Sequence, residues 1–551
     1  MMTEISILVG GKAGDGIRQA GHVIARLLNR IGYRIFFYDD YPSLIRGGHN
    51  FSIIRASEKS IAAHKETVDV IVALNQDTVD NHKHRLNTGG IILYDSKKSD
   101  AEGIGFDFMD IVKTFDGKPI MRNTAAIGAL AGALNIEWSV LEKVIMDAVE
   151  NSVDLNLKIA RHAYDRIENP SKTVPKLDQN PLPLVSGNEA IALGAVKAGL
   201  NMYIAYPMTP ASAILHYLAA YETELGVVTV HPESEIGVAL MALGTAYAGA
   251  RTMVGTSGGG FALMTEALSL AGQGELPMVI VESQRPGPGT GVPTYTMQGD
   301  LAFVVHAGHG EILRVVLAPG DAQEAFYTTG LAMNLAWKFQ IPTLVLSDKH
   351  LSESIFSFEA DLDKVKPEKP LLWKNQGEYK RYLDTQNGIS PLAFPGNPSA
   401  IVKATSYEHD ESGITTEEPE AISRMQRKRL RKRKALEDEL EKYETVNVYG
   451  NPDSKTVLLC WGSTKGACIE VAEALDLKVV QPLILEPLPV EALKKALSGA
   501  DKIIDVEVNA TGQLAKHVAG HGFCIDDMIL RFDARPFTVD VLIDNVKEVL
   551  S

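Results

Sequence analysis

Four short motifs in the middle of the chain carry side chains that could bind or activate a small molecule, and each directly follows a strand-like apolar run. They are Tyr206-Pro207-Met208-Thr209-Pro210, His231-Pro232-Glu233-Ser234-Glu235, Thr256-Ser257-Gly258-Gly259-Gly260-Phe261 and the loop around Arg285, ESQRPGPGTG. Ligands of open α/β sheets bind outside the carboxyl ends of the strands. We therefore expect these motifs to converge on one site.

The side chains of these motifs suit acid–base chemistry and anion capture. Glu233 and Glu235 would diverge at the start of a helix, so that one faces a pocket and the other faces water. The backbone around Gly258 allows a ligand to approach closely, and Arg285 suits bidentate binding of a carboxylate or phosphate. The structural alternatives are a helix cap for Thr209, a salt-bridged glutamate pair and an ordinary surface arginine.

A glycine-rich loop near the N-terminus is a second candidate site. Gly10, Gly11, Gly14 and Gly16 lie between a predicted strand and helix, where backbone N–H groups could reach a phosphate. The spacing is not that of a dinucleotide fingerprint, and Asp15 would repel a phosphate. Asp39 and Asp40 are placed to bind a ribose, but a tight turn without nucleotide is the favoured interpretation. Gly14-Asp15-Gly16 also resembles the start of a thiamine diphosphate–magnesium motif, yet residues 41–47 lack its asparagine and Asn50 comes late.

The histidines and cysteines give little sign of a metal centre. His306 and His309 lie three residues apart but lack a third convincing ligand, and His409 is interpreted as structural. The three cysteines, Cys460, Cys468 and Cys524, cannot supply four thiolates to an iron–sulfur cluster. They also cannot form a disulfide framework, which indicates a reducing cytoplasm.

The elements that must position these motifs form three segments in which strand-like and helical patterns alternate. This pattern predicts an α/β protein of three domains with mainly parallel sheets. The predicted domains are 1–168, 184–350 and 446–551, with a proline-punctuated linker at 169–183 and a connector at 351–445. Expected strands include 5–9, 34–38, 50–55, 68–73 and 90–94 in the first domain, and 202–207, 226–231, 251–257, 276–283, 313–318 and 342–347 in the second.

The connector holds the block ISRMQRKRLRKRKALEDELEKYE, predicted to be a solvated helix with opposed charge halves that packs on a neighbour.

Charge and hydropathy argue against two classes of partner, nucleic acids and membranes. The net charge of −15 over 551 residues argues against a nucleic-acid partner. The longest uncharged stretch, 198–221, is interrupted by two prolines, so no membrane span is predicted. The N-terminus lacks the features of a secretion signal, and we expect a soluble cytoplasmic protein.

The motifs and their order resemble the thiamine-dependent 2-oxoacid:ferredoxin oxidoreductases, specifically an α subunit with a γ domain fused in front. The resemblance lies in residues 187–195, YPMTPAS (206–212), 233–268 and 282–291 for the α subunit, in GGKAGDGI with 41–57 for the γ domain, and in 408–413, 506–514 and 532–538 for the closing domain. Lys12 and Asp15 depart from the expected γ-type glycine loop. The resemblance implies a thiamine pyrimidine-binding-type domain at 184–350 and a transketolase C-terminal-like domain at 446–551.

The resemblance also assigns roles to the four motifs. Glu235 matches the carboxylate that activates the cofactor through a hydrogen bond to its aminopyrimidine ring, with Glu233 as the second choice. Thr209 matches a substrate-binding residue, and Arg285 matches one that binds the substrate carboxylate or coenzyme A. Tyr206 is predicted to contact the substrate, and Thr256, Ser257 and Gly258 are predicted to contact the cofactor.

The same resemblance implies a partner. A separate β subunit would hold the diphosphate, Mg²⁺ and a [4Fe–4S] cluster, and coenzyme A and ferredoxin would be the acyl and electron acceptors. We predict a dimer of αβ pairs that oxidatively decarboxylates a 2-oxoacid, or runs in reverse, with 2-oxoglutarate favoured over pyruvate or branched-chain substrates. Alternatives of another class are a NAD- or flavin-binding oxidoreductase using the first glycine loop, and a non-catalytic scaffold subunit.

Overall fold

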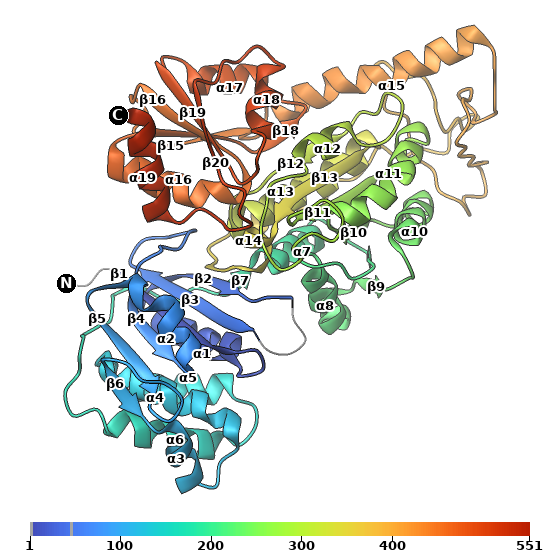
Figure 1. Cartoon of the computed structure of the whole chain (residues 1–551). Helices are drawn as coiled ribbons and strands as arrows, with labels where there is room; N and C mark the ends of the chain where they lie inside the picture. The colour runs from blue at the N-terminus through green and yellow to red at the C-terminus, as the bar shows by residue number, and fades with distance from the viewer. Residues whose placement is uncertain (1–3, 44–47) are drawn as a thin grey trace. The chain divides into compact units, whose positions relative to one another are not determined.

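The computed structural model describes residues 4–43 and 48–551, which form two compact units (Figure 1). The first unit contains the described parts of 1–186 together with 353–359 and 537–551, and the second contains 187–352 and 360–536. Each unit therefore draws on segments that are distant in the sequence. The domain boundaries expected from the sequence stay a prediction.

The first unit is built on an eight-stranded sheet with the order β6-β5-β4-β1-β3-β2-β14-β7. Its strands are β1 (Glu4–Lys12), β2 (Arg34–Asp40), β3 (His49–Ser57), β4 (Val68–Ala73), β5 (Leu86–Asp95), β6 (Ile104–Phe106), β7 (Leu184–Ser186) and β14 (Ile355–Ser357). Its helices are α1 (Ile17–Arg30), α2 (Gln76–His82), α3 (Phe108–Thr114), α4 (Arg122–Ala133), α5 (Trp138–Ala148), α6 (Val153–Asp165) and α19 (Val539–Leu550).

This first sheet is mixed, which differs from the parallel sheet expected for the N-terminal segment. Strands β1, β4, β5 and β6 pair in parallel, but β3 is antiparallel to both β1 and β2. The reason is the connection between β2 and β3, since only residues 41–48 join them. Parallel neighbours need a crossover of about a dozen residues or more.

The second unit contains the sheet that carries the four motifs, in the order β18-β12-β13-β11-β10-β8-β9. Its strands are β8 (Met202–Ile204), β9 (Val228–Val230), β10 (Thr252–Thr256), β11 (Met278–Gln284), β12 (Val315–Leu317), β13 (Pro342–Asp348) and β18 (Ile484–Glu486). The helices along this part of the chain are α7 (Gly187–Lys197), α8 (Ser212–Ala220), α9 (Glu222–Leu225), α10 (Glu235–Tyr247), α11 (Gly258–Gln273), α12 (Leu301–His306), α13 (Ala322–Phe339) and α14 (Lys349–Glu353). Every residue of β11 and β13 is buried, as expected for parallel strands covered on both faces.

A third sheet, with the order β15-β17-β16-β19-β20, lies in the C-terminal part of the second unit. Its strands are β15 (Val446–Gly450), β16 (Thr456–Cys460), β17 (Lys478–Pro482), β19 (Lys502–Glu507) and β20 (Asp527–Leu530), and its helices are α16 (Lys465–Leu475), α17 (Val490–Leu497) and α18 (Gln513–Ala519). Only β15 pairs antiparallel within this sheet. The second and third sheets are thus mainly parallel and the first is mixed, within an α/β protein.

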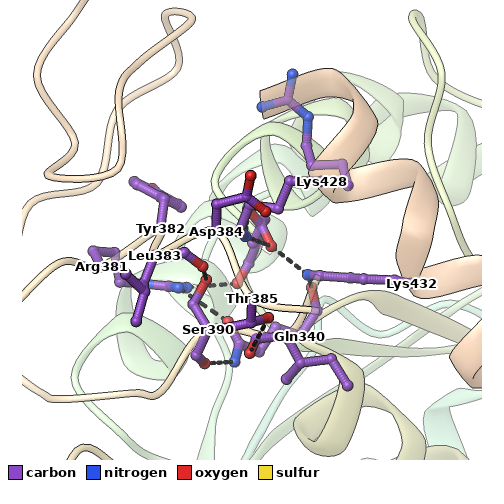
Figure 2. A network of polar contacts seen from close by, with 12 residues as sticks. Gln340, Arg381, Tyr382, Leu383, Asp384, Thr385, Ser390, Lys428 and Lys432 are labelled. Atoms are coloured by element: carbon purple, nitrogen blue, oxygen red, sulfur yellow. Dashed lines mark hydrogen bonds and ion pairs between the residues drawn. The ribbon is translucent and has the colours of Figure 1, made fainter. Parts of the chain in front are cut away.

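The charged block forms the long helix α15 (Pro419–Leu440), which is exposed along most of its length apart from a buried stripe. Lys428 and Lys432 lie on its buried stripe and are at most 1% exposed. Figure 2 shows both lysines in a network of polar contacts that also includes Arg381. Both ammonium groups form ion pairs with Glu275, and Lys428 Nζ lies 2.6 Å from Glu275 Oε1. Arg381 donates to the carbonyl oxygen of Glu275 over 2.6 Å. The stripe agrees with the expectation that this helix packs on a neighbour, but the burial of its two lysines was not expected and follows from the buried carboxylate that attracts both.

Within the described residues, no helix combines the length and the apolar character needed to cross a bilayer.

Candidate active site

The four motifs meet at one edge of the second sheet. Strands β11, β10, β8 and β9 are consecutive neighbours and all pair in parallel, so their carboxyl ends point the same way. Each motif begins at or just beyond one of these ends. The expected convergence is present, while the roles of the individual residues stay a prediction.

Glu235 is the buried member of the glutamate pair. It is the first residue of α10 and is 4% exposed, whereas Glu233 is exposed. Ser234, between them, has φ 60° and ψ 154°, a conformation that a residue with a side chain rarely adopts. The strained residue Ser234 therefore separates the two carboxylates. Glu235 faces inward.

The side chains of Thr256 and Glu235 both approach the Cα atom of Gly260 where a larger residue would carry its side chain. A Cβ atom at Gly260 would collide with Thr256 Oγ1 and lie 2.8 Å from Glu235 Oε1, so only glycine leaves this space open. Ser257 is fully buried, and its hydroxyl finds no hydrogen-bond partner among the described residues. An unpartnered buried hydroxyl beside a glycine turn fits a bound polar ligand. These residues therefore fit a bound cofactor.

Arg285 and Thr209 are also brought together. Arg285 Nη1 donates a hydrogen bond to the carbonyl oxygen of Thr209 over 2.8 Å. Burial lowers the pKa of the Arg285 guanidinium, yet arginine stays charged at physiological pH. Tyr206 is half-buried, and its ring packs edge-on against that of His231 with the ring centres 6.0 Å apart. Tyr206, Thr209 and Arg285 thus come from two loops at the same sheet edge.

Two fully buried acids and one half-buried acid near this edge were not predicted. Glu282 lies inside the fully buried strand β11, Asp348 ends the fully buried strand β13, and Asp300 immediately precedes α12. A Cβ atom at Gly258 would collide with Asp300 Oδ2. The sequence offers one signal for Glu282, which is an acid within the apolar run MVIVES. Burying a carboxyl among apolar residues costs free energy, so such an acid is expected to have a partner or a function.

The N-terminal glycine loop forms a self-contained turn. Asp15 Oδ2 accepts the amide of Lys12 over 3.1 Å, and Asp15 Oδ1 forms an ion pair with Arg122 over 2.5 Å. Asp39 pairs with Arg18, and Asp40 accepts the hydroxyl of Tyr38. This geometry agrees with a tight turn that needs no nucleotide. Part of the 41–47 window lies outside the described residues.

No metal centre emerges from the histidines and cysteines. In the described ranges, 4–43 and 48–551, no group of three His, Cys, Asp or Glu side chains could hold a metal ion. The His409 ring is fully buried against Tyr382, with ring centres 3.8 Å apart, in keeping with a structural role. Cys460 and Cys468 are buried, and Cys524 is exposed.

Comparison with known proteins places this arrangement in a family. Residues 6–166 match the pyruvate ferredoxin/flavodoxin oxidoreductase family, and residues 193–428 match the thiamine diphosphate-binding region of the pyruvate flavodoxin/ferredoxin oxidoreductases. The α subunit of a 2-oxoacid:ferredoxin oxidoreductase from Saccharolobus solfataricus is 31% identical, with 99% of this chain and 98% of its own covered. The 2-oxoglutarate synthase subunit KorA of Methanocaldococcus jannaschii is 31% identical over 59% of this chain and 88% of its own.

A solved structure agrees over the full length. The 2-oxoglutarate:ferredoxin oxidoreductase of Magnetococcus marinus, with 2-oxoglutarate, coenzyme A and succinyl-CoA bound, matches with a TM-score of 0.92 and 30% identity, and the match covers 100% of both chains. Sequence relatives, family models and fold therefore point the same way. The chain belongs to the 2-oxoacid:ferredoxin oxidoreductase family and is an oxidoreductase of the α-subunit type.

Proposed function

We propose that this chain is an α subunit with a γ-type domain fused at its N-terminus, and that its complex converts a 2-oxoacid and coenzyme A to acyl-CoA and CO₂. Electrons pass to ferredoxin, and the reaction can run in reverse. 2-Oxoglutarate is the proposed substrate. The full-length similarity to the Magnetococcus marinus enzyme, whose structure carries 2-oxoglutarate and succinyl-CoA, supports this choice.

The observation that carries the proposal is the buried carboxyl of Glu235 beside Thr256 at the sheet edge. Thiamine diphosphate, when bound, supplies a nucleophilic carbon and an electron sink for decarboxylation. Glu235 would hold a proton at the ring nitrogen of the aminopyrimidine, and its burial keeps water from competing for that proton. The Ser257 hydroxyl would find in the cofactor the hydrogen-bond partner that the described residues do not offer.

The proposed substrate groups lie on the neighbouring loops. Arg285 would bind the carboxylate of the 2-oxoacid or a phosphate of coenzyme A, because its planar fork matches both. The hydrogen bond from Arg285 to the Thr209 backbone orients the guanidinium in advance. Thr209 and Tyr206 would then contact the rest of the substrate.

A β partner is proposed to hold the diphosphate, Mg²⁺ and a [4Fe–4S] cluster. The N-terminus of α11 begins with three glycines and would otherwise suit a diphosphate, but the Asp300 carboxyl lies against Gly258 there. An acid at this position disfavours a second anion. The three cysteines of the chain are also too few for a Cys₄ cluster. We propose a dimer of αβ pairs as the assembly.

The test is an anaerobic assay of the complex purified through a tag on this chain. Viologen dye reduction is measured with 2-oxoglutarate, pyruvate and 2-oxoisovalerate, each with and without coenzyme A. We expect reduction that needs both the oxoacid and coenzyme A, and that is fastest with 2-oxoglutarate. Another ranking would reassign the substrate, and no reduction with any oxoacid, despite a co-purified iron–sulfur partner and added thiamine diphosphate, would refute the proposed chemistry.

A further inference from the structure

A pair of carboxyl groups behind the Ser257–Gly258 turn has no role in the proposed function so far. Glu282 is fully buried in β11, where its register partner on β10 is Thr256. The carboxyl of Asp300 lies within hydrogen-bonding reach of the Glu282 carboxyl. No N–H or O–H donor of the described residues reaches either oxygen of Glu282. Asp300 is itself fixed to β11, because Gln284 Oε1 accepts its amide over 2.9 Å.

The chemistry of this pair requires a proton. Two carboxyl groups can form a hydrogen bond only if one of them is protonated, since an ionised carboxylate is an acceptor only. The charged groups that act on Glu282 are Asp300 and Asp348, and both are acids. Full burial without a cation makes an ionised Glu282 costly. Glu282 therefore donates its proton to Asp300, which is the more exposed of the two.

The titration behaviour agrees with this geometry. Burial, with Asp300 and Asp348 close by, raises the pKa of Glu282 well above its usual range. Burial raises the pKa of Asp300 to about 6. Near neutral pH the pair thus holds one proton and one negative charge.

The position of the pair links it to the cofactor turn. Asp300 Oδ2 lies so close to Gly258 that a Cβ atom there would collide with it. Gly258 begins α11, and Thr256, two residues earlier, lies across from Glu282 in the sheet. Asp300 therefore contacts the turn at Gly258, and Glu282 lies next to Thr256 on the neighbouring strand β11.

We propose that Glu282 and Asp300 are positioning residues: the shared proton fixes Asp300 against Gly258 and so holds the Thr256–Gly258 turn in its working geometry. This inference rests on the proposed function and adds a residue pair to it. Loss of the shared proton leaves two carboxylates in contact, and their repulsion would displace the turn. The complex should therefore lose turnover at alkaline pH, with kcat more affected than KM.

The first test compares pH profiles of kcat for the anaerobic complex, with 2-oxoglutarate, coenzyme A and viologen. In Glu282→Gln the amide donates to Asp300 at every pH, so we expect activity near that of the wild type and no alkaline loss. Glu282→Ala should lower kcat at all pH values by about ten- to a hundredfold, because it frees Asp300. The control Asp505→Asn removes another buried acid, on β19, and should keep the alkaline loss. An alkaline loss equal in Glu282→Gln and the wild type would overturn the proposal.

A second measurement reports on the pair without turnover. The infrared difference spectrum between the wild-type complex and Glu282→Gln should contain the carbonyl band of a protonated carboxylic acid, and this band should vanish over the pH range in which kcat falls. Asp300→Asn serves if Glu282→Gln does not fold, because its amide can also donate within the pair. Absence of the band would refute the shared proton, whereas absence of oxoacid-dependent dye reduction in the wild type would refute the proposed function instead.

Discussion

Glu233 and Glu235, which are separated by one residue at the start of α10, lie in opposite environments. Glu235 is 4% exposed at the sheet edge, while Glu233 is exposed. The strained backbone of Ser234 separates their directions. This contrast makes Glu233 a matched control for Glu235, since both are carboxylates on the same turn.

Glu235→Gln should lower oxoacid-dependent dye reduction by about 10²–10⁴-fold, the usual contribution of a general acid or base. Glu233→Gln should leave the rate close to that of the wild type, because its side chain lies in water. The measurement is the anaerobic viologen assay of the purified complex. Equal effects of both substitutions, or a small effect of Glu235→Gln, would contradict the role proposed for Glu235.

Arg285→Lys tests the geometry of the proposed carboxylate site apart from its charge. Lysine keeps the positive charge but loses the planar fork and the oriented bond to the Thr209 carbonyl. We expect KM for the 2-oxoacid or for coenzyme A to rise about tenfold, which equals about 1.4 kcal/mol. Which of the two KM values rises identifies the ligand of Arg285. Unchanged values for both would remove Arg285 from the binding site.

The sequence could locate the motif residues but not the acids behind them. Each motif directly follows its strand, so its place at the sheet edge depends on local pattern and on the parallel pairing of neighbours. Glu282, by contrast, meets Asp300 only because the loop after β11 returns to the start of α12. The proton shared by these two acids depends on this tertiary contact, which no local spacing encodes.

At the scale of elements, α15 shows how a charged sequence can form an interior surface. Its buried positions follow helical spacing and include Met425, Lys428, Lys432 and Leu436. The lysines take core positions because Glu275, 153 residues away from Lys428, supplies the counter-charge. Burial alone would raise the pKa of Glu275. The positive charges of Lys432, Lys428 and Arg381 instead hold this pKa well below its usual range. A charge pattern read from the sequence alone indicates a solvated helix, because the partner carboxylate lies far away in the chain.

Lys432 gives α15 a pH-dependent contribution to stability. Burial lowers the pKa of Lys432 to about 7, against the attraction of Glu275. In the unfolded chain this lysine keeps its ordinary pKa, so between the two values the unfolded state binds the extra proton and stability rises with pH. The Tm of the wild type should therefore rise relative to that of Lys432→Met as the pH goes from neutral to alkaline.

Lys434→Met is the matched control for this prediction, since Lys434 lies on the same helix and its side chain is 75% exposed. Thermal unfolding at several pH values is the measurement, and Lys434→Met should differ from the wild type by an amount independent of pH. A pH-independent difference for Lys432→Met as well would mean that Glu275 keeps Lys432 charged throughout.

At the scale of the whole molecule, the C-terminal helix belongs with the N-terminal unit. Residues 537–551 group with 1–186, although a reading of element order along the chain predicts one C-terminal domain at 446–551. Asp540 on α19 accepts the backbone amides of Glu66 over 2.8 Å and of Thr67 over 3.1 Å. Val539 donates its amide to the carbonyl of His64 over 3.1 Å. The last helix of the chain is therefore part of the first unit.

A chain that ends after Pro536 should accordingly lose protection in the first unit rather than in the third sheet. Hydrogen exchange should become faster in β3 and β4, whose connection loses the contacts of Asp540, while β16 and β19 keep their rates. Asp540→Ala should produce a weaker form of the same change, by about 1–3 kcal/mol of local stability, because two amides lose their acceptor. Asp544→Ala, on an exposed position of the same helix, should have no such effect. Faster exchange confined to β16 and β19 would instead assign α19 to the C-terminal domain and separate the first unit from the end of the chain.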